Sequence, residues 1–228
     1  GAMQFRCASH VRTLYSAVMP ESLRRHPDSP PCAAARIAVE ATRHDGGRLL
    51  LSYAVTGAID ALRLPPAGPP ERRDGLWRHT CFEAFLSTVP GGPYVEINLS
   101  PSTAWAAYRF DGYRAGMRPL PAITTPAIAV ERGAETFTLR AELSLDAVPA
   151  LSLDAVPALA PATAWRLALA AVIEDRDGVS HWALAHPPGP PDFHHPDGAT
   201  LTLVPICPPI HAPVLAPVGT PSPATVRP

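Results

Sequence analysis

The sequence of 228 residues contains no lysine, a single asparagine (Asn98) and a single glutamine (Gln4), so all 19 basic residues are arginine. Without lysine, the chain cannot form a Schiff base through a lysine amine, and it cannot contain the phosphate-binding motif G-x-x-x-x-G-K-[ST]. The simplest explanation of this composition is a genome rich in G and C. Because such a genome disfavours asparagine codons, Asn98 is a candidate functional residue.

Charge of one sign and long hydrophobic runs are also absent. The formal net charge is −1, so the composition indicates no attraction to nucleic acid or to an anionic membrane. No apolar run approaches the roughly 18 residues of a membrane-spanning helix, and the first residues lack the apolar run of a signal peptide. The four cysteines are scattered without a C-x-x-C pair, which predicts neither a disulfide framework nor a zinc knuckle. We therefore expect free thiols and a cytoplasmic location.

Proline, by contrast, is abundant, with 30 residues, while 46% of the chain is apolar. An interior proline costs a helix about 3 kcal/mol, whereas turns, strand starts and edge strands accept it. The apolar fraction is sufficient for a packed core. The composition therefore favours many short strands joined by turns.

Short apolar or alternating segments recur every 8–15 residues with turn residues between them. No helix longer than two turns is expected. The expected strands are residues 36–42, 48–56, 59–64, 76–88, 94–99, 104–110, 123–130, 135–145, 165–174, 179–186 and 199–204. This rhythm predicts an all-β fold, an antiparallel β-sandwich of jelly-roll or immunoglobulin-like type with about eleven strands. The absence of a βαβ rhythm makes a Rossmann fold or a TIM barrel a poor match.

The expected organisation is an irregular N-terminal segment (1–33), a sandwich domain (34–204) and a proline-rich, mobile tail (205–228). Residues 143–150 are repeated unchanged as residues 151–158. A tandem repeat of this length is too short for a solenoid, and a sandwich would accept the insertion only in a loop. Residues 146–163 are therefore expected to lie outside the sheets.

Several central strands are expected to present polar and aromatic side chains together on the side away from the core, because side chains in a strand alternate between its faces. The residues concerned are Glu83, Tyr94, Glu96, Asn98, Trp105 and Arg109. Aromatic rings between planar hydrogen-bonding groups suit a ligand with a flat apolar face and polar edges, of which a sugar ring is the usual case. A solvated face with structural ion pairs, or an oligomer interface, would give the same pattern.

A second polar cluster lies late in the chain, where His186, Asp192, His194, His195 and Asp197 fall within twelve residues. Histidine with a carboxylate can bind a metal or transfer protons. The spacing matches no known zinc motif, and a proline-rich loop also uses such side chains to satisfy its backbone. The cluster is therefore either structural, in contact with a ligand, or the centre of a metal-dependent hydrolase that uses His186, Asp192 and His194.

Other motifs of catalysis are absent, including G-x-S-x-G and G-x-G-x-x-G. Glu83 and Glu96 resemble the carboxylate pair of a glycosidase only in residue type, because their separation is not given by the sequence. The balance favours a binding module over an enzyme, with the question of catalysis left open.

Five segments resemble the bacterial DOMON-like proteins, which belong to the superfamily of the family-9 carbohydrate-binding modules. The segments are LWRHTCFEAFL (76–86), YVEINLSP (94–101), WAAYRFDGYR (105–114), WALAHP (182–187) and PDFH (191–194). The resemblance spans roughly residues 35–204. It implies a β-sandwich whose concave sheet holds a ligand.

The resemblance implies that two aromatic residues clamp a sugar while glutamate, asparagine and arginine bind its hydroxyls. The matching residues are Trp105 and Trp182 (or Trp77) with Glu83, Glu96, Asn98 and Arg109, and Arg114 completes the candidate set. In other relatives the same face holds haem b, for which Met117 and His186 would be the axial pair. The leading hypothesis is a non-catalytic module for a saccharide-like ligand, without a cofactor. Haem binding, metal-dependent hydrolysis and a structural or interaction module remain the alternatives.

Overall fold

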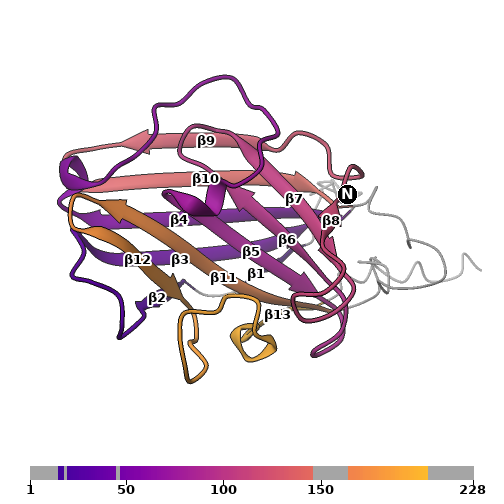
Figure 1. Cartoon of the computed structure of the whole chain (residues 1–228). Coiled ribbons are helices and arrows are strands. Elements are labelled where there is room, and N and C mark those ends of the chain that lie inside the picture. Colours follow the sequence, from indigo (N-terminus) through magenta and orange to yellow (C-terminus); the bar gives the residue numbers. More distant parts are fainter. Residues whose placement is uncertain (1–14, 18–19, 45–46, 146–163, 205–228) are drawn as a thin grey trace, which may run out of the picture.

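The computed structural model describes residues 15–17, 20–44, 47–145 and 164–204 and shows an all-β fold of thirteen antiparallel strands (Figure 1). The strands are β1 (Tyr15–Ala17), β2 (Glu21–Arg25), β3 (Ala34–His44), β4 (Arg48–Gly57), β5 (Cys81–Ser87), β6 (Tyr94–Leu99), β7 (Trp105–Phe110), β8 (Arg118–Pro119), β9 (Ala127–Arg132), β10 (Thr136–Ser144), β11 (Trp165–Asp175), β12 (Gly178–Ala183) and β13 (Leu201–Leu203). Three short 3-10 helices, η2 (Ile59–Ala61), η3 (Leu76–Arg78) and η4 (Pro196–Gly198), lie between them. The predicted all-β sandwich is confirmed.

The strands form one curled sheet in the order β8-β7-β6-β5-β11-β12-β2-β3-β4-β10-β9, with β1 paired to β3 and β13 to β11. The sheet folds over at β12 and β2, which share only two residue pairs. Figure 1 shows the result as two layers, with the strands from β5 to β8 and from β11 to β13 in front and the strands from β1 to β4, β9 and β10 behind. We call these the front and rear layers.

The rear layer alternates buried and exposed residues as the sequence predicts. In β4, Leu49, Leu51, Tyr53 and Val55 are buried, and the residues between them are more exposed. In β10, Phe137, Leu139, Ala141 and Leu143 do the same. The buried side chains of both strands form the main core together with those of the front layer. The outer face of the rear layer is thus the solvated side of the sandwich.

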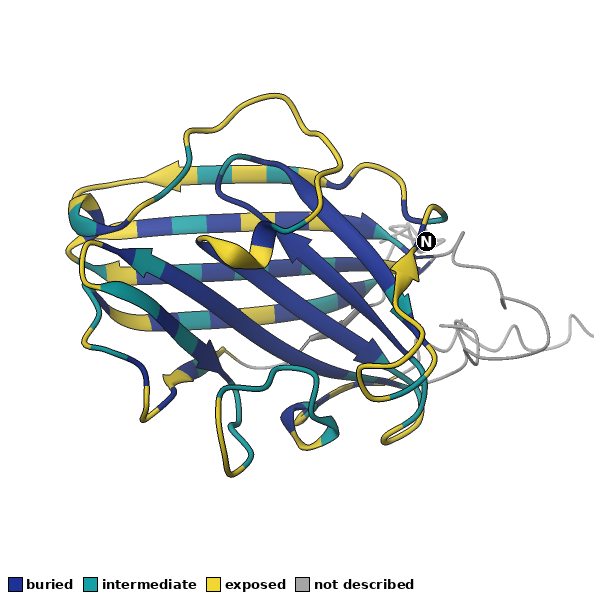
Figure 2. Cartoon of the chain, in the orientation of Figure 1, coloured by how far each residue is buried: buried dark blue, intermediate teal, exposed yellow. Residues whose placement is uncertain are grey.

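The front layer is buried on both faces. Figure 2 shows β5, β6 and β11 almost uniformly buried, in contrast to the alternation in the strands behind them. Phe82, Ala84 and Leu86 of β5 join the main core. Cys81 and Phe85 point the other way, into a second cluster that includes Phe193 from the loop after β12. We call the side of the front layer that faces away from the rear layer its outer face.

Three expected elements differ from the structure. The strand expected over residues 59–64 is absent, and η2 (Ile59–Ala61) begins there instead, because Ala61 and Leu62 donate their amides to the carbonyls of Ala58 and Ile59, three residues earlier. Residues 76–78 form η3, which begins at Gly75 with a left-handed φ of 76°. The strand expected over 123–130 starts only at Ala127, after Pro126, which has no amide hydrogen to donate to a ladder.

The N-terminal segment was predicted to be irregular, but it contains two strands, β1 and β2. Both strands pair with β3, and β2 also pairs with β12, which is distant in sequence. Strands of three and five residues are too short to show a strong periodicity of their own. The first copy of the eight-residue repeat begins in β10. Residues 146–163, which were predicted to lie outside the sheets, and the predicted mobile tail 205–228 lie outside the described residues.

Candidate functional site

A cavity of about 360 Å³ opens on the outer face of the front layer. Its floor comes from strands, with Glu83 from β5 and Glu96 from β6, and loops supply its rim. The lining residues are Trp77, Glu83, Glu96, Phe110, Arg114, Met117, Val172, His181, Pro191, Phe193 and His194. The volume and the mixture of aromatic and polar groups are those of a small-ligand site.

The sheet register explains why the two glutamates meet there. Glu83 is paired with Asn98 across β5 and β6, and Glu96 is paired with Phe85. Glu83, Glu96 and Asn98 therefore share one face, as the alternation predicts. All three are buried, with exposed fractions of 3%, 4% and 0%.

Five residues of the predicted ligand-binding set and the late polar cluster line this one cavity: Trp77, Glu83, Glu96, Arg114 and His194. Asn98 is not on its surface. Its amide Nδ2 donates a hydrogen bond of 2.7 Å to Oε1 of Glu96, two residues earlier in the same strand. Asn98 therefore positions a carboxyl group and does not itself line the cavity.

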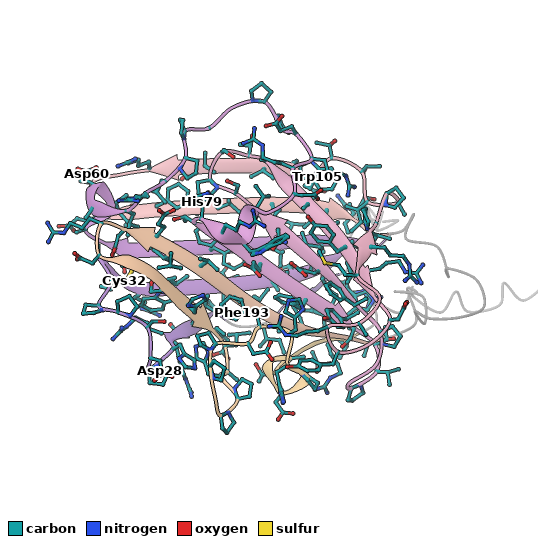
Figure 3. The ribbon with its side chains drawn as sticks, in the orientation of Figure 1. Asp28, Cys32, Asp60, His79, Trp105 and Phe193 are labelled. Atoms are coloured by element: carbon teal, nitrogen blue, oxygen red, sulfur yellow. The ribbon has the colours of Figure 1, made fainter. Side chains whose placement is uncertain are left out.

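The prediction that Trp105 and Trp182 stack on a ligand is wrong. Both side chains belong to the main core between the layers. The guanidinium of Arg72 covers the Trp105 ring at 4.1 Å, and the Trp182 indole donates to Ser180 Oγ at 2.9 Å. In Figure 3, Trp105 lies well away from Phe193, which lines the cavity.

The prediction that Arg109 binds the ligand is also wrong, because Arg109 lies on the same face of β7 as Trp105, which is the core face. In the ladder between β6 and β7, Trp105 lies opposite Leu99 and Arg109 lies opposite Val95, and both partners are core residues. Arg109 makes an ion pair with Asp111 at 3.7 Å. The outer face of β7 is instead formed by Ala106, Tyr108 and Phe110.

The two carboxyl groups on the floor sit in an environment that disfavours their charge. Burial, with a further contribution from Glu96, raises the pKa of Glu83 well above its ordinary value. Burial raises the pKa of Glu96 to about 7, against the opposing effects of the Asn98 hydrogen bond and the Arg114 charge. Oε1 of Glu83 is buried and makes no hydrogen bond. Burial therefore favours the protonated form of both carboxyl groups, and near pH 7 the Glu96 carboxyl is about half ionised.

His194 closes one side of the floor through its two ring nitrogens. Nδ1 shares a hydrogen bond of 2.7 Å with the Tyr94 hydroxyl, and Nε2 lies 4.0 Å from Oε2 of Glu96. Burial lowers the pKa of His194 to about 4, and the Arg114 charge adds to this. The imidazole is therefore neutral near pH 7, and its contact with Glu96 is not a charged ion pair.

A polar network anchors Arg114 at the rim. Its guanidinium donates to Oδ1 of Asp192 at 2.7 Å, and the Tyr113 hydroxyl donates to Oδ2 of the same carboxylate. Although burial opposes it, these bonds lower the pKa of Asp192. Arg114 also has a left-handed φ of 52°, which is unusual for a residue other than glycine. The network joins the loop before β8 to the loop after β12.

Trp77 forms another part of the rim. It lies in η3 with 36% of its surface exposed, and its ring contacts Tyr108 edge-on at 5.9 Å. The Tyr108 hydroxyl donates in turn to Asp74 at 2.6 Å. The indole is thus held in place from below with one surface free for a ligand.

The late loop is held by two histidines, of which only His186 was predicted from the sequence to take part in chemistry. Nε2 of His186 lies 2.8 Å from the Arg24 carbonyl, and Nε2 of His26 lies 3.1 Å from the Gly189 carbonyl. His186 does not line the cavity. His194 and Asp192 make the separate contacts given above, and residues 15–17, 20–44, 47–145 and 164–204 contain no group of three or more histidine, cysteine or acidic residues arranged to hold a metal ion. The geometry therefore does not favour the predicted hydrolase centre.

The proposed axial pair for haem b does not converge either. Met117 lines the cavity and is 47% exposed. His186 lies outside it, with Nε2 engaged by a backbone carbonyl of β2. These residues do not fit the group for which they were predicted.

Five lining residues, Phe110, Val172, His181, Pro191 and Phe193, were not predicted as site residues. His181 precedes Trp182 in β12, so the two side chains point to opposite faces of the strand. Once Trp182 is assigned to the core, alternation predicts that His181 lies on the outer face. Phe110 alternates with Arg109 in the same way. Phe193 comes from a loop, where no periodicity indicates direction.

The part of the chain that the structure describes has no helix long and apolar enough to cross a membrane. Cys32 and Cys81 are free thiols.

The fold is similar to a solved structure of a putative carbohydrate-binding protein from Bacteroides uniformis. The two superpose with a TM-score of 0.55 at 14% sequence identity, over 81% of this chain and 83% of the other. At that identity the likeness concerns the fold alone. No protein-family model and no curated protein matches the sequence.

Proposed function

We propose that the protein is a non-catalytic binding module that takes a small saccharide-like ligand in the cavity on the outer face of the front layer. The observation that carries the proposal is the placement of two buried glutamates, Glu83 and Glu96, on the floor below the exposed indole of Trp77. The indole offers a flat apolar surface to ring C–H groups. The carboxyl groups, Arg114 and His194 offer hydrogen bonds to hydroxyls.

Two likenesses support this class of ligand. The five segments quoted above resemble DOMON-like proteins, and we propose that the chain is a relative of them and of family-9 carbohydrate-binding modules. The Bacteroides uniformis protein of similar fold is described as carbohydrate-binding, on a provisional basis. The proposed location is the cytoplasm, where free Cys32 and Cys81 would persist.

Isothermal titration with a panel of neutral mono- and disaccharides tests the proposal, with Trp77→Ala as the decisive variant. Loss of a stacking ring at the rim of a binding site typically costs about 1–2 kcal/mol, or about a 5- to 30-fold loss of affinity. Arg78→Ala is the matched control, because Arg78 is in the same 3-10 helix but does not line the cavity. The control should bind like the wild type.

Absence of heat with every sugar would contradict a saccharide ligand. If self-association were then seen by sedimentation, the outer face would be better explained as an interaction surface. Equal losses in Trp77→Ala and Arg78→Ala would place the binding site elsewhere.

A further inference from the structure

We propose that the ligand carries a protonated amine, which lies between the carboxyl groups of Glu83 and Glu96. This inference rests on the proposed function, because it uses the same cavity and adds a charge to the ligand class. An amino sugar is the simplest compound that meets both requirements.

The first observation is a buried carboxyl oxygen without a partner. Glu83 lines the cavity, and only 3% of its surface is exposed. Its Oε1 makes no hydrogen bond. A buried polar group left in this state costs about 1–3 kcal/mol, and more when it is charged. An ammonium group in the cavity would supply the missing donor and a compensating charge.

Glu96 likewise lacks a cationic partner of its own. Oε1 accepts from the neutral amide of Asn98, and Oε2 lies 4.0 Å from the ring of His194. Nδ1 of His194 shares a hydrogen bond with the Tyr94 hydroxyl, and burial lowers the pKa of the imidazole to about 4. His194 is therefore neutral near pH 7 and brings no positive charge to Glu96.

Arg114 is the one arginine among the described residues that line the cavity, and Asp192 neutralises it at 2.7 Å. Its charge lowers the pKa of Glu96, but burial still raises that pKa to about 7. Asp192 thus balances the charge of Arg114, and neither Glu83 nor Glu96 has a cation to itself. A cationic ligand would stabilise the ionised form of these two carboxyl groups, which burial otherwise disfavours.

The other titratable groups facing the two carboxyls do not supply a cation near neutral pH. Burial raises the pKa of the Cys81 thiol and, to about 12, that of the Tyr94 phenol, so both stay protonated and uncharged. Burial also raises the pKa of Tyr108, and the hydrogen bond to Asp74 adds to this. Burial lowers the pKa of His181, which therefore stays neutral.

The walls of the cavity suit a cation as well. The rings of Trp77, Phe110 and Phe193 line it. An ammonium group is attracted to the face of an aromatic ring, by about 0.5–2 kcal/mol depending on how far it is desolvated. A neutral sugar gains its hydrophobic contact from the same rings but no such charge interaction.

The test compares four probes by isothermal titration in phosphate at pH 7: D-glucosamine, D-glucose, N-acetyl-D-glucosamine and ethanolamine. Phosphate is used because amine buffers would compete. We expect glucosamine to bind at least about tenfold more tightly than glucose or the N-acetyl sugar, which has the same ring without the charge. In an unbuffered pH-stat titration, glucosamine should release protons from the carboxyls, up to about one per ligand.

Glu83→Gln should abolish the preference for glucosamine and reduce the proton release, so that this variant binds glucosamine no more tightly than it binds glucose. Glu96→Gln should do the same, so a failure of one variant to fold leaves the other. Glu142→Gln is the matched control, because Glu142 lies in β10 of the rear layer and pairs with Arg48. It should match the wild type in both measurements.

Equal affinity for glucosamine and glucose without proton release would overturn the amine inference and leave saccharide binding standing. Binding of ethanolamine but of no sugar would support the amine and overturn the saccharide. Silence from all four probes would contradict the amine, and silence extending to the neutral panel above would contradict saccharide binding too.

Discussion

Asn98 donates a hydrogen bond of 2.7 Å to Glu96, two residues earlier in the same strand and on the same face. Asn98 is fully buried, so its amide has no water to bind instead. The Cys81 thiol lies 3.8 Å from its Oδ1. The only asparagine in the chain thus fixes the orientation of a carboxyl group on the cavity floor.

Asn98→Ala should therefore affect both stability and the Glu96 carboxyl. Removal of a buried hydrogen-bond partner costs about 1–3 kcal/mol. The Asn98 bond lowers the pKa of Glu96, so its loss should raise that pKa above about 7. Urea unfolding and a carboxyl-carbon NMR titration measure the two effects. An unchanged Glu96 titration would show that the bond does not operate in solution.

Glu96→Gln should change how stability depends on pH. The folded pKa of about 7 lies above the ordinary 4.5, so the stability that Glu96 contributes is complete below pH 4.5 and is lost as pH rises through about 7. The full effect is roughly 3 kcal/mol. Glutamine stays neutral, so the variant should gain on the wild type by roughly 2–3 kcal/mol between pH 5 and pH 8. Parallel curves from urea unfolding would contradict this.

His194 should act in the opposite direction. Its folded pKa of about 4 lies below the ordinary 6.5, so its contribution is complete above pH 6.5 and is lost as pH falls through about 4. His194→Leu should remove this acid sensitivity, at a cost of about 1 kcal/mol for the lost Tyr94 bond. His195→Leu changes the neighbouring residue and should retain the wild-type profile. Thermal unfolding between pH 4 and pH 7 is the measurement, and equal acid sensitivity in all three proteins would argue against the assignment.

Substitution of Trp105 should mainly reduce stability, whereas substitution of Trp77 should mainly reduce ligand binding. Trp105→Ala empties a core position that is 3% exposed and should cost about 3–5 kcal/mol. Trp77→Ala removes a half-exposed ring and should cost about 1 kcal/mol or less, with the loss seen in ligand binding instead. Urea unfolding of both variants, with titration of Trp77→Ala, separates the two roles. A large loss of stability in Trp77→Ala would make it a structural residue.

The sequence alone determined the all-β class, most strands and the shared face of Glu83, Glu96 and Asn98. These follow from local causes: proline and turn residues end elements, and alternation with period two assigns faces within one strand. The same alternation placed Trp105, Ala107 and Arg109 on one face of β7, which is correct.

Which face of a front-layer strand is the outer one depends on its neighbours in the folded sheet. Parity within a strand says nothing of its neighbour, and it is the pairing of Trp105 with Leu99 that directs the ring into the core. The front layer also has apolar residues on both faces, so hydrophobicity could not identify the core side of β7. The meeting of Arg114 with Asp192, and of Tyr94 with His194, joins segments 78 and 100 residues apart. Such contacts depend on how the sheet curls and where the loops pack, which no local pattern encodes.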